Sequence, residues 1–139
     1  MTSKLKCILL VDDDSVTNYI HKRHIEYCEV TDCIQMASDG QVALDIITQI
    51  NNKEIPDNNG AKLTPDLIFL DINMPRMNGW QFLEAYQQLE EIEKSKVIIL
   101  STSVDSADKL KAESYDSVSE YVVKPLNETK INNIMSTYF

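Results

Sequence analysis

The sequence contains little cysteine or glycine, is short of basic residues, and has no long apolar run. Among its 139 residues are three cysteines and three glycines, and 13 Lys and Arg stand against 22 Asp and Glu, for a formal net charge of −9. Three cysteines without metal-ligand spacing predict neither a disulfide framework nor a zinc site, and unpaired thiols suit a reducing compartment. No glycine-rich loop follows the first apolar run, which argues against a nucleotide-binding protein.

The charge balance also limits the partners that we expect. Binding to nucleic acid needs clustered Lys and Arg to neutralise phosphates, and an acidic chain is disfavoured on anionic membranes. The start of the chain, MTSKLKC, lacks the apolar stretch of a signal peptide, and no run approaches transmembrane length. We therefore expect a single cytoplasmic domain, residues 1–139, that binds neither nucleic acid nor membrane.

Four short apolar runs are present, and each ends on polar residues. Their sequences are KCILLVDDD, LIFLD, VIILS and YVVKP, which end on Asp12, Asp13 and Asp14, on Asp71, on Ser101 and on Lys124. Short apolar runs of this kind are typical of strands in a sheet that is buried on both faces. Ligands of such sheets bind beyond the carboxyl ends of the strands. The runs therefore predict a site for a divalent cation and a phosphoryl group.

Strand and helix patterns alternate five times, which predicts a parallel sheet with helices on both faces. The expected strands are about 6–11, 33–37, 67–71, 96–101 and 120–123. The expected helices are 15–28, one through 43–50, one from Gly79, 106–115, and one after the N-cap Asn127. In the first helix we expect Ser15 as N-cap and an apolar face of Val16, Tyr19, Ile20, Ile25 and Cys28. The segment 51–66 has no period and is expected to be a long exposed loop.

The acidic residues at the strand ends suit phosphoryl transfer. Mg²⁺ takes oxygen ligands and usually uses one or two carboxylates, a role that fits Asp13 and Asp71. Without a metal the two charges would repel each other by roughly 4 kcal/mol at about 4 Å in an effective dielectric near 20. A carboxylate can also act as the nucleophile and form an aspartyl phosphate.

The motifs VDDD, LDINMPRMNGW, ILSTS and YVVKP, each at the end of an expected strand, together resemble the receiver domain of two-component response regulators. The resemblance runs from Lys6 to Tyr138 and is greatest to stand-alone, single-domain receivers. It implies a flavodoxin-like, doubly wound, five-stranded parallel sheet of order 2-1-3-4-5 with five helices.

The same resemblance implies the roles of the acidic residues. Asp71 would be the phosphoacceptor for a phosphohistidine on a sensor histidine kinase or a histidine phosphotransfer protein. Mg²⁺ would be bound by the side chains of Asp13 and Asp71 and by the backbone carbonyl of Asn73. Asp12 would support the metal through water.

Five further residues receive a role from the resemblance. Lys124 would pair with a phosphoryl oxygen, and Ser101 would hydrogen-bond to another. Tyr121 corresponds to the switch aromatic, which follows the hydroxyl residue inward on phosphorylation. The peptide bond before Pro125 is expected to be cis, and Gly79 to provide the turn into the third helix.

The sequence departs from the family pattern in three places. Ser101 stands where threonine is commoner, and Thr102 where alanine or glycine is usual, so that its bulk is expected to narrow access to the phosphoryl group. The run of hydroxyl residues leaves the register open by one position. The long 51–66 loop is expected to affect partner choice or dimerisation.

Several other polar and aromatic residues are interpreted as structural. Asp14 and Asn78 are expected to be turn and capping residues, and Trp80 to serve packing. Neither His21 nor His24 is expected to be a phosphorelay histidine or a metal ligand.

We interpret the chain as a two-component response regulator that acts through protein–protein contacts, with a downstream protein target and a possible homodimer. It is not expected to be an enzyme beyond its own phosphorylation and autodephosphorylation. The alternative is a non-phosphorylated pseudo-receiver that acts as a binding module. A phosphatase with an aspartate nucleophile is disfavoured, because Asn73 occupies the position where a general acid would be needed.

Overall fold

Five parallel strands form one sheet in the computed structural model, which describes residues 4–51, 64–89 and 94–139. The strands are β1 (Ile8–Val11), β2 (Ile34–Ala37), β3 (Leu67–Asp71), β4 (Lys96–Ser101) and β5 (Val118–Val123). Their order is β2-β1-β3-β4-β5, and all neighbouring pairs are parallel. The predicted doubly wound sheet of order 2-1-3-4-5 is confirmed.

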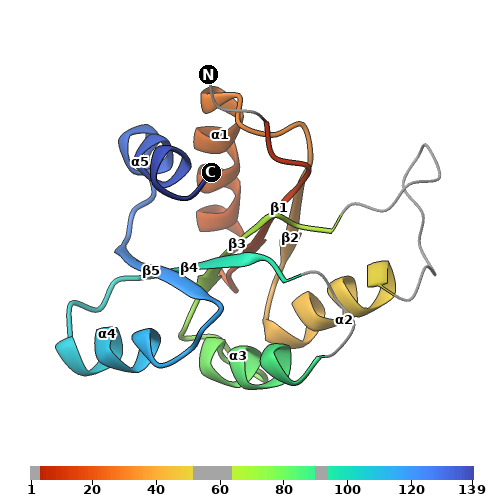
Figure 1. Ribbon diagram of the computed structural model, residues 1–139, viewed down its shortest axis with the longest axis vertical. Helices are drawn as coiled ribbons and strands as arrows, with labels where there is room; N and C mark the ends of the chain where they lie inside the picture. Colours follow the sequence, from red (N-terminus) through yellow and green to blue (C-terminus); the bar gives the residue numbers. More distant parts are fainter. Residues whose placement is uncertain (1–3, 52–63, 90–93) are drawn as a thin grey trace.

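Helices cover both faces of the sheet (Figure 1). They are α1 (Ser15–Cys28), α2 (Gly40–Asn51), α3 (Gly79–Gln88), α4 (Ser106–Glu113) and α5 (Glu128–Tyr138). Helices α1 and α5 lie on one face, and α2, α3 and α4 lie on the other. Each face has its own buried apolar cluster. Within the described ranges, no helix combines the length and apolarity that a membrane crossing requires.

The strand register brings the polar strand ends to one edge of the sheet. Val11 of β1 lies opposite Leu70 of β3, so the residues after Val11 lie beside Asp71. Ser101 at the end of β4 lies opposite Val123 of β5, the residue before Lys124. The apolar runs form the buried middle of the sheet, and the charged groups that follow them lie at its carboxyl-end edge.

Most of the predicted element bounds are close to the observed ones. The ranges predicted for α1, β3 and β4 are confirmed, whereas β1 begins at Ile8, β2 at Ile34 and β5 at Val118. Helix α4 ends at Glu113, before the predicted bound. Most of the 51–66 segment, predicted to be an exposed loop, lies outside the described residues.

The start of α1 differs from the prediction. The N-cap is Asp14, not Ser15, because the Asp14 carboxylate accepts hydrogen bonds from the backbone N–H groups of Val16 and Thr17 at 2.9 and 3.2 Å. Two acceptor oxygens make aspartate at least as good a cap as serine.

The predicted apolar face of α1 is wrong at its N-terminal half. Val16, Tyr19 and Ile20 have relative exposures of 63, 58 and 45%. The residues of α1 that are buried are Asn18, His21 and Ile25. Two polar residues therefore occupy the inward face, because they have hydrogen-bond partners close to the carboxyl-end edge of the sheet.

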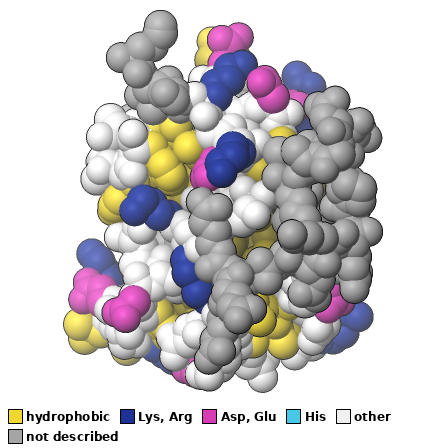
Figure 2. Space-filling view, turned by 45° about the vertical axis from the view of Figure 1, so that its right-hand side comes forward, with side chains coloured by type: hydrophobic (Ala, Val, Ile, Leu, Met, Phe, Trp, Pro, Cys, Tyr) yellow, Lys and Arg dark blue, Asp and Glu magenta, His cyan; other side chains and the backbone are white. Residues whose placement is uncertain are grey.

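The surface carries charges of both signs. On the face in Figure 2, the Lys and Arg side chains of the described residues lie interspersed with Asp and Glu side chains and with small apolar areas. Cys7, next to the start of β1, is 0% exposed and is a buried core residue.

Candidate functional site

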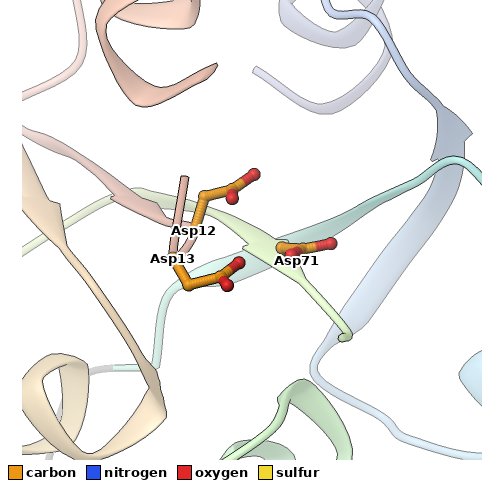
Figure 3. A group of neighbouring side chains, drawn as sticks. All are labelled: Asp12, Asp13 and Asp71. Atoms are coloured by element: carbon orange, nitrogen blue, oxygen red, sulfur yellow. The ribbon is translucent and has the colours of Figure 1, made fainter. Parts of the chain in front are cut away.

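Three carboxylates converge at the carboxyl-end edge of the sheet (Figure 3). Asp12 and Asp13 follow β1, and Asp71 is the last residue of β3. One oxygen of each carboxylate lies within 4.8 Å of the others. Asp12 and Asp71 are 5 and 8% exposed, whereas Asp13 is exposed. The sequence-based expectation that these residues meet is confirmed, and they form an acidic cluster open to solvent on the Asp13 side.

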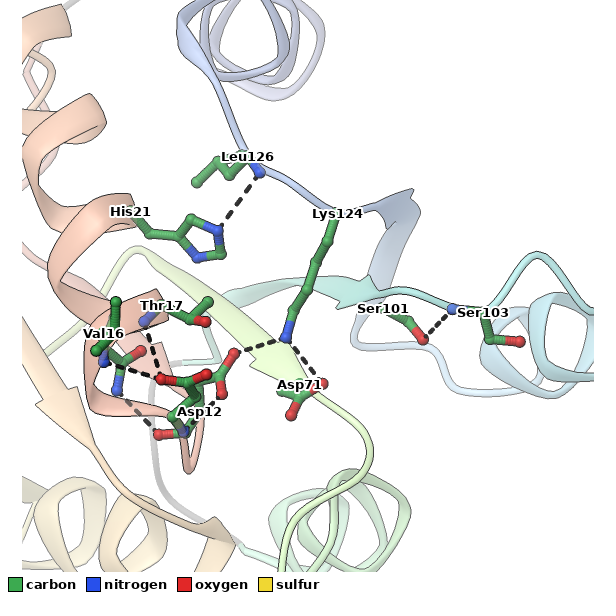
Figure 4. A network of polar contacts seen from close by, with 11 residues as sticks. Asp12, Val16, Thr17, His21, Asp71, Ser101, Ser103, Lys124 and Leu126 are labelled. Carbon is green, nitrogen blue, oxygen red and sulfur yellow. Dashed lines mark hydrogen bonds and ion pairs between the residues drawn. The ribbon is translucent and has the colours of Figure 1, made fainter.

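Lys124 reaches into the acidic cluster from the end of β5 (Figure 4). Its Nζ lies 2.7 Å from Asp12 Oδ2 and 3.3 Å from Asp71 Oδ1. The Lys124–Pro125 peptide bond is cis, as expected. Three carboxylates and one ammonium leave an excess of two negative charges in this small volume.

Burial raises the pKa of Asp71 above its ordinary value, and the charge of Asp12 raises it further, while Lys124 opposes the shift. Burial alone would lower the pKa of Lys124. The hydrogen bond to Asp12 and the charge of Asp71 outweigh burial and raise the pKa of this lysine instead. Lys124 is therefore kept in its cationic form. The ionised form of Asp71 is electrostatically disfavoured, and a further positive charge nearby would stabilise it.

The donor set fits Mg²⁺. Octahedral coordination at about 2.0–2.1 Å places ligand oxygens at most about 4.2 Å apart, so the 4.8 Å cluster needs only small side-chain rotations. Hard oxygen ligands are those that Mg²⁺ prefers, and two positive charges would balance the excess of two negative charges. The acidic cluster can therefore hold a divalent cation.

Asn73 lies two residues after Asp71 in the β3–α3 loop (residues 72–78), and it is exposed. This loop is closed by a hydrogen bond from Gly79 N–H to the carbonyl of Ile72 at 2.8 Å. A Cβ on Gly79 would lie 2.6 Å from the Asp71 carbonyl oxygen and 2.8 Å from Ile72 Cα. Only glycine fits there, which agrees with the predicted turn into α3.

Ser101 is the last residue of β4 and is 1% exposed. Its Oγ accepts a hydrogen bond from Ser103 N–H at 3.0 Å and is turned toward Ser103 rather than Asp71 (Figure 4). Tyr121 is partly buried, and its hydroxyl donates to the Ser103 carbonyl at 2.9 Å. Thr102 is exposed beside them. The β4–α4 loop (residues 102–105) is therefore fastened by side chains from both predicted switch residues.

Asn18 of α1, which the sequence did not single out, and the N-cap residue Asp14 support the site. Asn18 Nδ2 donates to the Asp12 carbonyl at 2.9 Å, and Asp14 N–H donates to Asp12 Oδ1 at 2.9 Å. Both contacts fix Asp12. No sequence signal indicated Asn18, because the predicted apolar face of α1 did not include this position.

His21 is a buried structural histidine. Its Nε2 accepts a hydrogen bond from Leu126 N–H at 3.4 Å, and burial, together with the charge of Lys124, lowers the pKa of His21 to about 4. The ring is neutral at pH 7 and joins α1 to the segment that follows Lys124. In this position it is not a member of the acidic cluster.

The predicted structural roles of the remaining residues agree with the contacts. Asn78 caps α3 in a capping box with Gln81. Trp80 stacks on Tyr115 with ring centroids 6.1 Å apart, and Lys111 Nζ lies 4.6 Å from the centre of the Trp80 ring. These contacts pack α3 against α4.

The fold is that of a flavodoxin-like α/β protein, and three carboxylates cluster at the carboxyl-end edge of its sheet. A family model described as the response regulator receiver domain matches residues 8–136. The chain belongs to this family.

Solved structures with the same fold include two-component response regulators. The protein from Cytophaga hutchinsonii is 32% identical, with a TM-score of 0.82 and 96% of each chain covered. The protein from Legionella pneumophila is 29% identical, with a TM-score of 0.75, and the match covers 96% of this chain and 99% of that one.

Among curated relatives, the probable methanogenesis regulatory protein FilR2 of Methanothrix harundinacea is 28% identical over 86% of this chain and 72% of its own length. The transcriptional regulatory protein DcuR of Escherichia coli is 27% identical over 93% of this chain but only 48% of its own. The chain thus spans about half the length of several curated relatives, and a common receiver domain is what it shares with them.

Proposed function

We propose that this chain is a phosphoacceptor switch in two-component signalling, with Asp71 as the residue that takes the phosphoryl group. The observation that carries the proposal is the site geometry. A buried carboxylate with a raised pKa lies 3.3 Å from the Lys124 ammonium and beside two further carboxylates. The donor would be the phosphohistidine of a sensor histidine kinase or a histidine phosphotransfer protein.

In the proposed reaction, an oxygen of Asp71 attacks the phosphorus of the phosphohistidine. The phosphorus–nitrogen bond breaks, and the imidazole leaves and takes up a proton, so that an acyl phosphate remains on Asp71. Mg²⁺, held by Asp13, Asp71 and the Asn73 carbonyl with Asp12 behind a water, would balance negative charge on the phosphoryl oxygens. Lys124 is close enough to Asp71 to pair with one of these oxygens.

The proposed signal is a shift between two conformations of the β4–α4 loop. Ser101 Oγ would leave Ser103 N–H and bond to the phosphoryl group, and Tyr121 would follow it inward. The face of α4, β5 and α5 would then change its affinity for a downstream protein. We infer a cytoplasmic protein that acts on no outside substrate, loses its phosphoryl group by its own hydrolysis, and contacts a protein target or a second copy of itself.

Intact mass tests this proposal. The wild type is incubated with acetyl phosphate, with and without Mg²⁺, beside Asp71→Asn and the control Asp116→Asn, which changes an exposed aspartate outside the site. A Mg²⁺-dependent gain of one phosphoryl group in the wild type and the control, absent in Asp71→Asn, supports the switch. No gain together with no Mg²⁺ binding would favour the pseudo-receiver, a binding module without phosphorylation.

A further inference from the structure

The β3–α3 loop is attached to the start of α2 at two points. Gly40 N–H donates to the Met77 carbonyl at 3.0 Å, and the guanidinium of Arg76 forms an ion pair with the carboxylate of Asp39. A Cβ on Gly40 would lie 2.8 Å from Met77 Cγ, so the loop packs tightly on the helix start. Two segments 37 residues apart in sequence are thus held together beside the acidic cluster.

The ion pair is unequal in its exposure. The side chain of Asp39 is 2% exposed, whereas that of Arg76 is 69% exposed. The Asp39 carboxylate also accepts a hydrogen bond from Val42 N–H at 2.9 Å. Burial acts against the charge of Asp39, but this hydrogen bond and Arg76 outweigh it and lower the pKa of the carboxyl. Without Arg76, the negative charge of the buried Asp39 carboxylate would have no cationic partner, which is energetically costly. This cost favours conformations in which the Arg76 guanidinium stays in contact with Asp39.

The backbone of Arg76 is in the left-handed region, with φ of 62°. This conformation costs a residue with a side chain about 1 kcal/mol or more. Glycine would avoid that penalty, yet the loop has arginine here. The contact with Asp39 offsets the backbone penalty and thereby selects one conformation of the loop.

The loop that is fixed in this way contains Asn73, three residues before Arg76 and two after Asp71. We propose that Arg76 is a positioning residue: its ion pair with Asp39 holds the β3–α3 loop so that the Asn73 backbone carbonyl is ready for the divalent cation. This inference rests on the proposed function, because Asn73 is a ligand only if the acidic cluster binds Mg²⁺. The Arg76 guanidinium pairs with Asp39, so Arg76 is not proposed as a ligand of the cation or of the phosphoryl group.

A purely electrostatic role of Arg76 and a positioning role predict opposite changes in Mg²⁺ affinity when Arg76 is removed, so the two can be distinguished. If Arg76 acted only through its charge, its removal would tighten Mg²⁺ binding, and removal of the Asp39 charge would weaken it. If Arg76 acts by positioning, loss of either partner frees the loop and weakens Mg²⁺ binding. Asp39→Asn is suitable, because asparagine keeps an acceptor for Val42 N–H.

The experiment is titration calorimetry of Mg²⁺ into the wild type, Arg76→Ala, Asp39→Asn and the double variant. Each single variant is expected to bind roughly tenfold more weakly, and the double variant no more weakly than either single one. Arg23→Ala, which removes an exposed arginine from α1, is the control and is expected to bind as the wild type does. The phosphorylation rate of Arg76→Ala at saturating Mg²⁺ is expected to equal that of the wild type.

Unchanged or tighter Mg²⁺ binding by Arg76→Ala would overturn the positioning role while the proposed function stood. If the wild type itself did not bind Mg²⁺, the proposed function and this inference would both fall. A metal-free readout separates the loop from the metal: amide exchange at Gly40 N–H, which bonds to Met77, should accelerate in Arg76→Ala without Mg²⁺. Equal exchange in the two proteins would show that the ion pair does not hold the loop.

Discussion

The β3–α3 and β4–α4 loops follow neighbouring strands at the same edge of the sheet, but they are held in different ways. The β3–α3 loop is fastened through its backbone, at Gly79 to Ile72 and at Met77 to Gly40, and by a buried carboxylate. The β4–α4 loop is fastened by side chains. Its Ser103 receives a hydroxyl hydrogen bond from Tyr121 and donates to the hydroxyl of Ser101.

The different attachment of the two loops suits one of them to a fixed conformation and the other to rearrangement. Side-chain hydrogen bonds each contribute about 1 kcal/mol, and their partners can rotate away, so the β4–α4 loop can rearrange at low cost. Its Val104 is 82% exposed and adds little packing. The β3–α3 loop, in contrast, is held by backbone hydrogen bonds and close backbone packing, which restrict it to one conformation. The loop beside Asp71, the proposed acceptor, therefore has a fixed conformation, and the loop that would signal is free to move.

Gly79→Ala should disrupt the β3–α3 loop most strongly. The new Cβ would meet the backbone of Asp71 and Ile72, which cannot rotate away. We expect a loss of about 2–3 kcal/mol in the free energy of unfolding, measured with urea. Gly40→Ala is the comparison: its Cβ would meet one backbone atom, the Met77 carbonyl oxygen at 2.9 Å, and otherwise the Met77 side chain, which can rotate, so it should cost less. Equal losses would contradict the tight closure at Gly79.

Tyr121→Phe should loosen the β4–α4 loop and leave the acceptor intact. The lost hydrogen bond to Ser103 is expected to lower the free energy of unfolding by about 1 kcal/mol and to accelerate amide exchange in that loop. Tyr138→Phe, which loses hydroxyl contacts to Ser119 and Glu120 instead, is the control. A similar change in β4–α4 exchange in both variants would remove the special role of Tyr121.

Asp71→Asn should stabilise the metal-free protein at neutral pH. The pKa of Asp71 is higher in the folded than in the unfolded protein, so the folded state binds more protons, and the unfolding free energy falls as pH rises above the ordinary value of 3.8. Asparagine removes that penalty. We expect a Tm a few degrees above the wild type at pH 7 in EDTA, measured by thermal unfolding.

The advantage of Asp71→Asn should shrink below about pH 4, where the wild-type carboxyl is protonated in both states. Mg²⁺ should stabilise the wild type more than the variant. A lower Tm for the variant at pH 7 without metal would mean that the charge of Asp71 does not destabilise the folded protein.

Thr102→Ala should have the smallest effect, on rate rather than stability. Thr102 is exposed beside Ser101, where a smaller side chain would widen access to the phosphoryl group. We expect phosphorylation by acetyl phosphate to be roughly threefold faster, equivalent to about 0.6 kcal/mol of barrier. Thr129→Ala, an exposed threonine on α5, should leave the rate unchanged. An unchanged rate for Thr102→Ala would show that this side chain does not restrict access.

The sequence predicts the strand-end residues well because continuous apolar runs mark the buried strands without ambiguity. Strands β3 and β4 have the predicted bounds, and parallel pairing then brings Asp71 and Ser101 to one edge. Helix α1 was harder, because its inward face contains Asn18 and His21, whose partners lie far along the chain or in the backbone. Hydropathy alone therefore placed Val16, Tyr19 and Ile20 inside in error, whereas Ile25 is buried as predicted.

The contact between Arg76 and Asp39 could not be predicted from the sequence. The two residues belong to different loops, and neither has a pattern that indicates its partner. Only the folded sheet brings the start of α2 beside the β3–α3 loop. The sequence thus predicted the residues of the acidic cluster, while the contacts that hold them required the structure.

Hydrogen–deuterium exchange of the wild type with Mg²⁺, with and without acetyl phosphate, tests most directly whether the β3–α3 loop stays fixed while the β4–α4 loop rearranges. Peptides that cover the β3–α3 loop and the β4–α4 loop are compared, with Asp71→Asn under the same conditions as the control. The account predicts that acetyl phosphate changes exchange in the β4–α4 loop of the wild type and leaves the β3–α3 loop nearly unchanged. A large change in the β3–α3 loop with none in the β4–α4 loop, or the same change in Asp71→Asn, would contradict it.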